Sequence, residues 1–188
     1  MKNVVTITLI AFLSFFFFDL SSSVKAAQTD KRLDVLFEHL LTTKDKSRAQ
    51  TIEAEIWKIW IENDDEEIES AMLNGTHAMH SGDLYIALVF FNKIVKLQPK
   101  FAEGWNKRAT VNYLLGNYDN SIEDIARTLL LEPQHFGAFS GLGLVNHKIG
   151  RIDAAVIAFQ NALKINPHLS GAKDAIRSIK NVLKEQKT

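Results

Sequence analysis

The chain offers few side chains that could carry out chemistry, and the first candidates are two histidines. His77 and His80 are three residues apart, so on a helix their imidazoles would share one face. A zinc site needs further ligands, but the chain has no cysteine, and Glu69 stands two turns away from His77. We therefore expect solvated histidines in a groove, without a bound metal or any other cofactor.

A serine among glycines is the second candidate. Ser140 lies in the stretch Phe139-Ser140-Gly141-Leu142-Gly143, which superficially resembles a nucleophile loop. Such a loop has glycines two residues before and two residues after the serine, on a turn from a strand to a helix. Here the serine falls inside an expected helix, and no strand is expected anywhere in the chain. A glycine loop for phosphate also requires a preceding strand. We expect a protein that is not an enzyme.

A fixed period of 34 residues separates three glycines and also the three prolines of the chain. They are Gly82, Gly116 and Gly150, and Pro99, Pro133 and Pro167. A period of this length is typical of repeat proteins, in which each unit buries its apolar face by stacking on its neighbours. Each glycine stands where a left-handed turn would end one helix, and each proline stands beyond a second helix. The unit is therefore predicted to be helix A, a glycine turn, helix B and a proline.

Small and large residues also keep their register when the units begin at Ile68, Ala102 and Phe136. Two positions of the unit hold small residues and two hold large apolar residues. The small residues are Gly75, Ala109 and Gly143 at position 8 and Ala87, Ser121 and Ala155 at position 20; the large ones are Phe91, Ile125 and Phe159 at position 24 and Leu97, Leu131 and Ile165 before the prolines. A small residue facing a large one lets two helices approach closely. The pattern predicts an all-α solenoid of stacked antiparallel helix pairs.

This pattern resembles the tetratricopeptide repeat (TPR) family over roughly residues 68–167. Trp105 and Phe139 supply the bulky residue of position 4, and Leu142-Gly143 matches the pair at positions 7 and 8. The family tyrosine of position 11 is missing, which makes the surface of the A helices individual to this protein. The residues in its place are Ala78, Asn112 and Asn146. The resemblance extends to small exported TPR proteins of Gram-negative bacteria.

Further helices are expected on both sides of the three clear repeats. Lys31–Thr43 and Ser47–Ile61 should form a degenerate helical hairpin that caps the stack and buries Trp57 and Trp60. An amphipathic helix should close the other end. The acidic run at 64–67 precedes a helix whose dipole favours negative charge, and a binding role is the alternative. The predicted segments are a signal peptide at 1–26, the hairpin at 27–67, repeats at 68–101, 102–135 and 136–169, and a capping helix at 170–188.

The first 26 residues have the layout of a secretory signal peptide. Lys2 gives a positive start, an apolar run covers residues 4–18, and the stretch 24–26 has the small residues that suit signal peptidase. We expect cleavage between Ala26 and Ala27 and export to the periplasm, or secretion, so that only the signal peptide contacts a membrane. An uncleaved anchor is the alternative, although the apolar run is shorter than the roughly 20 residues that span a bilayer.

The expected binding surface follows from the family resemblance. The balance of 22 basic and 22 acidic residues argues against a nucleic-acid partner, which requires a basic field. In the TPR family, helix A residues at positions 2, 5, 9, 12 and 13 face a concave groove. The predicted partner-binding residues are Met72, Thr76, Met79, His80, Asn106, Thr110, Tyr113, Ser140, Leu144 and His147. Flexible methionines tolerate varied ligands, and Asn and Thr side chains offer hydrogen bonds to a peptide backbone.

One known binding mode of the family is not encoded here. Some members grip the C-terminal carboxylate of a peptide with Lys, Asn and Arg side chains, but the corresponding places hold Met72, Thr76, Lys107, Gly137 and Gly141. We expect a non-catalytic scaffold or adaptor that binds a protein or peptide of the cell envelope. The alternatives are a peptide- or small-molecule-binding component of a transport or sensing system, a metal-dependent or hydrolytic enzyme, and self-association through the groove or the hairpin.

Overall fold

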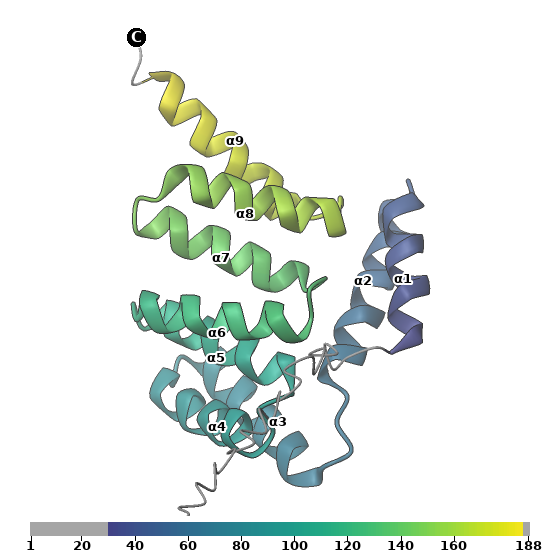
Figure 1. Ribbon diagram of the computed structural model, residues 1–188, viewed down its shortest axis with the longest axis vertical. Coiled ribbons are helices and arrows are strands. Elements are labelled where there is room, and N and C mark those ends of the chain that lie inside the picture. Colours follow the sequence, from purple (N-terminus) through teal and green to yellow (C-terminus); the bar gives the residue numbers. More distant parts are fainter. Residues whose placement is uncertain (1–29, 186–188) are drawn as a thin grey trace, which may run out of the picture.

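The computed structural model describes residues 30–185, which form nine α-helices and no β-strand. Helices α3 to α8 form three antiparallel pairs that stack on one another, and α9 lies against the last pair (Figure 1). The bounds are α1 (Lys31–Thr42), α2 (Lys46–Ile61), α3 (Glu66–Ser81), α4 (Leu84–Leu97), α5 (Ala102–Leu114), α6 (Tyr118–Leu131), α7 (Phe136–Lys148), α8 (Ile152–Ile165) and α9 (Ser170–Glu185). The all-α solenoid predicted from the 34-residue period is confirmed. The predicted signal peptide and its cleavage site lie outside the described residues.

Each stacked pair reverses direction at a glycine in the left-handed conformation. Gly82, Gly116 and Gly150 have φ angles of 84°, 80° and 79°, and no other residue between 30 and 185 has a positive φ. After the first of these glycines, the amide of Asp83 donates to the carbonyl of Ala78 at 2.9 Å, which closes the end of α3. A side chain with a Cβ would be strained at these positions. The predicted glycine turns are therefore confirmed.

Close contact within a pair depends on the missing side chains of two glycines. A Cβ at Gly143 would lie 2.6 Å from the ring of Phe159, and a Cβ at Gly75 would lie 2.9 Å from the ring of Phe91. Carbon atoms prefer separations of about 3.5–4.0 Å, so only glycine lets the phenylalanines of α8 and α4 approach this closely. The predicted register of small against large residues is confirmed at both pairs.

Helices α1 and α2 form an antiparallel hairpin, as predicted, but it does not cover the α3 end of the stack. The hairpin lies beside the stack and runs along the stacking direction (Figure 1). Its buried core includes Phe136, the first residue of α7, and packs against Ile165 and Leu169. Trp60 is fully buried there, whereas Trp57 is half-buried. The predicted position of the cap is wrong because the tryptophans find their apolar partners on the third repeat.

The stacked helices α3 to α9 begin and end in different ways. Asp65 is the N-cap of α3, and its carboxylate accepts hydrogen bonds from the amides of Glu67 and Ile68 at 2.9 and 3.3 Å. This interaction gives part of the acidic run a structural role. Helix α9 buries Ala172 and Ile179 against α8 while its basic residues stay exposed, so the predicted amphipathic closing helix is confirmed. Between residues 30 and 185, no helix combines the length and apolar character that crossing a membrane requires.

Candidate protein-binding groove

Trp57 lies where α2 crosses the N-terminal ends of α5 and α7. Its ring occupies the space that a side chain at Gly137 would fill, because a Cβ there would lie 2.5 Å from Cη2 of the indole. The ring also meets Phe136 edge-on with the centroids 5.5 Å apart, and Lys107 Nζ lies 5.8 Å from its centroid. Lys107 and Gly137 hold two of the places that, in some TPR proteins, grip the C-terminal carboxylate of a bound peptide. Helix α2 therefore covers the middle of the surface on which a partner was expected.

A buried polar cluster holds α2 in this position. The imidazole of His135 stacks on the ring of Trp60, with centroids 4.0 Å apart and planes 11° from parallel. His135 and Glu103 are both fully buried, and His135 Nε2 lies 2.9 Å from Glu103 Oε2. Glu103 comes from the first turn of α5, and His135 is the residue before α7. The cluster thus joins the hairpin to two repeats at once.

The backbone determines which nitrogen of His135 carries the proton. The amide of Ala138 donates to Nδ1 at 3.0 Å, so Nδ1 must be unprotonated to accept this hydrogen bond. The proton of the neutral ring is then on Nε2, which donates to the Glu103 carboxylate. This contact is therefore a hydrogen bond from a neutral imidazole to a charged acceptor. Such charge-assisted bonds are stronger than bonds between neutral groups.

Glu103 stays ionised although it is buried. Burial raises the pKa of its carboxyl group, but the hydrogen bond from His135 and the charge of Lys107 outweigh this effect, and the pKa lies below its ordinary value. Lys107 Nζ lies 3.2 Å from Oε1, and Asn106 Nδ2 donates to Oε2 at 2.9 Å. Of these contacts, the sequence shows the i,i+3 spacing of Glu103 and Asn106 and the i,i+4 spacing of Glu103 and Lys107. The pairing with His135, 32 residues later, has no local signal.

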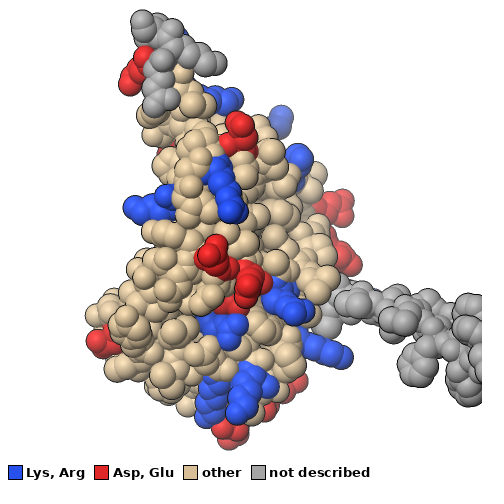
Figure 2. Space-filling view, turned by 60° about the vertical axis from the view of Figure 1, so that its left-hand side comes forward, with Lys and Arg blue, Asp and Glu red and all other residues tan. Residues whose placement is uncertain are grey.

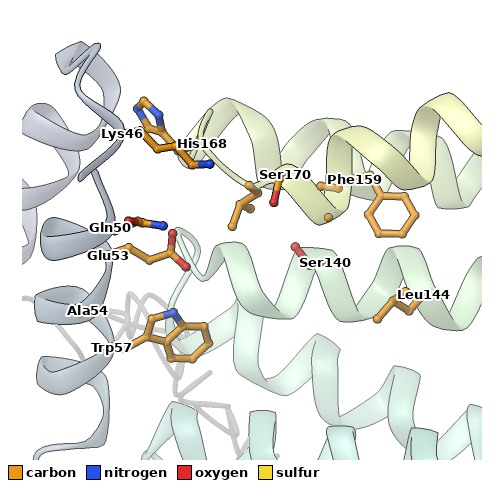
Figure 3. Close-up of a pocket in the computed structure, with 13 residues that line it drawn as sticks. Lys46, Gln50, Glu53, Ala54, Trp57, Ser140, Leu144, Phe159, His168 and Ser170 are labelled. Atoms are coloured by element: carbon orange, nitrogen blue, oxygen red, sulfur yellow. The ribbon is translucent and has the colours of Figure 1, made fainter. Parts of the chain in front are cut away.

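Two recesses remain open on either side of Trp57. The first, which we call the Ser140 recess, has a volume of about 700 Å³ and lies between α2, α7 and the start of α9 (Figure 3). Ser140 and Leu144 line it from α7, and Lys46 and Glu53 line it from α2. The carboxylate of Glu53 accepts a hydrogen bond from Asn166 at 2.9 Å. Trp57 forms the wall nearest to the second recess.

The second recess, which we call the Met72 recess, has a volume of about 930 Å³ and lies between α2 and α3. Trp57 and Ile61 line it from α2, and Met72, Leu73 and Thr76 line it from α3. Lys107 of α5 also contributes to its wall. Trp57 is therefore shared by the two recesses and separates them.

The structure brings the ten predicted groove residues together only in part. Met72 and Thr76 line the Met72 recess, and Ser140 and Leu144 line the Ser140 recess. The other six line neither recess. Met79 and Tyr113 are half-buried in the repeat cores, Asn106 is buried beside Glu103, and His80, Thr110 and His147 are exposed. Trp57, which separates the two recesses, was predicted to be a buried core residue of a cap.

The histidine pair does not gather further metal ligands. His77 and His80 are both exposed on α3. Among the described residues, no three His, Asp or Glu side chains converge as they would around a metal ion.

Comparison with known proteins identifies the family. The family model of the tetratricopeptide repeat matches residues 137–169. A TPR repeat-containing protein of Rhizobium etli is 32% identical over 158 residues, which cover 84% of this chain and 78% of that protein. The chain belongs to the TPR family, whose repeats build scaffolds that are usually non-catalytic. Other curated relatives match over smaller shares of their length, such as protein bimA of Emericella nidulans, 32% identical over half of this chain and 12% of its own.

Solved structures of low sequence identity share the fold. The TPR domain of Arabidopsis OM64 has a TM-score of 0.60 at 22% identity, covering 62% of this chain and 96% of that domain. The first TPR domain of Spaghetti (RPAP3), solved with an HSP90 peptide, has a TM-score of 0.61 at 18% identity, with coverages of 64% and 95%. MamA has a TM-score of 0.58 at 23% identity, with coverages of 73% and 78%. TPR domains are typically modules that bind peptides of partner proteins.

Proposed function

We propose that this protein is a non-catalytic adaptor that binds a segment of a partner protein in the two recesses beside Trp57. The proposal rests on the observation that predicted groove residues and residues of α2 line the same two recesses. Positions 5 and 9 of the first repeat, Met72 and Thr76, and of the third repeat, Ser140 and Leu144, each face a recess whose other wall is α2. A tryptophan shared by two concave sites is the kind of anchor at which binding energy concentrates.

The proposed location is the cell envelope. The layout of residues 1–26 supports export, and the partner would then be an envelope protein or peptide. The test is osmotic shock of the natural host, followed by N-terminal sequencing of the released protein. The proposal expects a mature chain that begins near Ala27. Intact residues 1–26 on membrane-bound material would contradict export.

A second candidate is supported by the size of the recesses. Volumes of about 700 and 930 Å³ fall in the range of small-molecule pockets, roughly 300–1,000 Å³. A peptide- or small-molecule-binding component of a transport or sensing system would use the same walls. The exposed leucines of both recesses favour a peptide segment, because they can pack against side chains that extend beyond the recess.

Two exposed leucines allow the proposed binding site to be tested without disturbing the core. Leu73 and Leu144 are exposed on α3 and α7, so Leu73→Gln and Leu144→Gln should leave the melting temperature close to that of the parent. The double variant should lose the partner in affinity purification from crosslinked periplasm. Ile157→Gln, on an exposed site of α8 outside both recesses, is the matched control. Undiminished capture by the double variant would contradict the proposal.

A further inference from the structure

We propose, building on the proposed function, that the Met72 recess recognises a partner segment in which apolar side chains stand next to lysine or arginine. The Ser140 recess would not discriminate in this way. The inference depends on the apolar surface and on the charges of the residues that line the two recesses.

The apolar part of the Met72 recess is exposed on two facing helices. Leu73 on α3 is 71% exposed and Ile61 on α2 is 39% exposed, and both line the recess. Trp57 and the buried Met72 complete the surface. Large apolar side chains from two helices around one concavity can desolvate an apolar side chain of a partner. The apolar residues of the segment would sit here.

The charges around this recess are not balanced within the protein. Asp64 and Glu69 line it, and neither makes an ion pair with another residue of the described chain. Two of the other charged residues are already paired: Glu62 with Arg32 at 2.5 Å, and Lys107 with Glu103 at 3.2 Å.

Two lysines line the Met72 recess, and of these only Lys58 makes no ion pair with another described residue. Two unpaired carboxylates therefore face one unpaired ammonium. A guanidinium or ammonium next to the apolar residues of a partner would complete this set and would hasten its encounter with the site.

The Ser140 recess has a different charge pattern. Its lining cation, Lys46, has no ion pair within the described part of the chain, and His168 stands beside it. Its lining carboxylate, Glu53, accepts a hydrogen bond from the neutral amide of Asn166 and, like Lys46, makes no ion pair with another described residue. One unpaired carboxylate is thus matched by one unpaired ammonium, so a basic segment would gain less there than in the Met72 recess, where unpaired carboxylates outnumber unpaired ammonium groups. The two recesses are thus distinguishable by charge, and the basic segment belongs in the Met72 recess.

The test uses a random-peptide library displayed on phage and selected on the purified protein. Peptides that are enriched should combine apolar residues with lysine or arginine. Their affinity, measured by fluorescence anisotropy on labelled synthetic copies, should fall about tenfold with Leu73→Gln, the loss expected when an apolar anchor is truncated. Asp64→Asn combined with Glu69→Gln should weaken binding similarly and reduce its salt dependence. Leu144→Gln, the matched control, should bind like the parent.

Other outcomes separate this inference from the proposed function. Enriched peptides that are acidic or uncharged, or that lose affinity with Leu144→Gln and not with Leu73→Gln, would overturn the inference and leave partner binding in the groove intact. Peptides whose affinity is unchanged by both leucine variants would contradict both. A selection that enriches no peptide would overturn the inference, while the capture of a folded partner from periplasm would still test the proposed function.

Discussion

At the scale of single residues, Glu103 and His135 show how burial changes the role of a charged side chain. Position 2 of a TPR unit faces the groove in the family, so a glutamate there was expected at the surface. The structure instead buries Glu103 under α2 and surrounds it with His135, Asn106 and Lys107. Helical periodicity places Glu103 on the correct face of α5. It carries no information about a hairpin that covers this face.

Substitution of His135 should therefore lower the free energy of unfolding, even when another aromatic ring takes the place of the imidazole. Phenylalanine at this place can still stack on Trp60, but Glu103 loses the hydrogen bond from His135 and the amide of Ala138 loses its acceptor. A hydrogen bond to a charged group contributes about 1.5–3 kcal/mol, and we expect a loss in this range for His135→Phe in urea unfolding. The double variant Glu103→Gln/His135→Phe should recover part of that loss, because a neutral amide then replaces the buried carboxylate that has lost the hydrogen bond from His135. A loss below about 1 kcal/mol would contradict this description of the cluster.

Two buried glutamates should give the stability opposite dependences on pH. The pKa of Glu103 lies below its ordinary value of 4.5, so its contribution is present above that value and is lost as the pH falls through the folded pKa. Burial raises the pKa of Glu132 above 4.5, so Glu132 favours the fold at low pH and weakens it as the pH rises through its folded pKa. Glu132→Gln should stabilise the protein at pH 7, and this gain should disappear toward pH 4. Thermal melts of parent and variant across this range test the sign, and an equal gain at both pH values would refute it.

At the scale of helices, the sequence predicts what is local and periodic. The glycine turns, the ends of the B helices two residues before each proline, and the contact of Gly143 with Phe159 all follow from the 34-residue period, and all are observed. The position of the hairpin does not follow from this period. Trp57 and Trp60 show that α2 has an apolar face, but that face could be buried at several places on the stack. Because Gly137 has no side chain, α2 can place Trp57 against it. In the sequence, however, Gly137 indicates only that one residue of the family's carboxylate-gripping set is absent.

Gly137 should be sensitive to the smallest possible substitution. An added Cβ would lie 2.5 Å from Trp57, whereas a Cβ at Gly141 in the same helix would meet Ile125 at an ordinary 3.7 Å. Gly137→Ala should therefore shift α2, change the tryptophan fluorescence and lower stability by about 1–3 kcal/mol, the usual range for overpacking. Gly141→Ala should instead be neutral or stabilising, since alanine favours the helix by up to about 1 kcal/mol. Equal effects of the two substitutions would mean that Trp57 does not lie over Gly137.

The close approach of α7 and α8 makes a similar prediction for Gly143. A Cβ there would overlap the Phe159 ring, with the nearest atoms 2.6 Å apart, so Gly143→Ala should cost about 1–3 kcal/mol. Because repeats are stabilised by contact with their neighbours, the loss should lower the melting temperature of the whole stack. Gly171→Ala in α9, where no atom lies within 4 Å of the added carbon, is the control. A Gly143→Ala variant that melts like this control would contradict the packing.

At the scale of the whole molecule, the hairpin changes a simple solenoid into a more closed arrangement. In a regular solenoid each unit contacts only its neighbours, but here α1 and α2 pack beside the stack and join residues of the second and third repeats (Figure 1). On the face seen in Figure 2, acidic and basic side chains are interspersed among broad uncharged areas. The distinctive surface is therefore the divided groove beside Trp57.

The most direct measurement of the central claim is site-specific photocrosslinking in living cells. A benzoylphenylalanine would replace Leu73 in the Met72 recess, Leu144 in the Ser140 recess, or Val89 on α4, all of which are exposed leucine or valine side chains on helix surfaces. If the recesses beside Trp57 bind a partner, irradiation should produce a discrete adduct from position 73 or 144 and none from position 89. Adducts from position 89 alone would place the partner on the outer face of the stack and contradict the groove as the binding site.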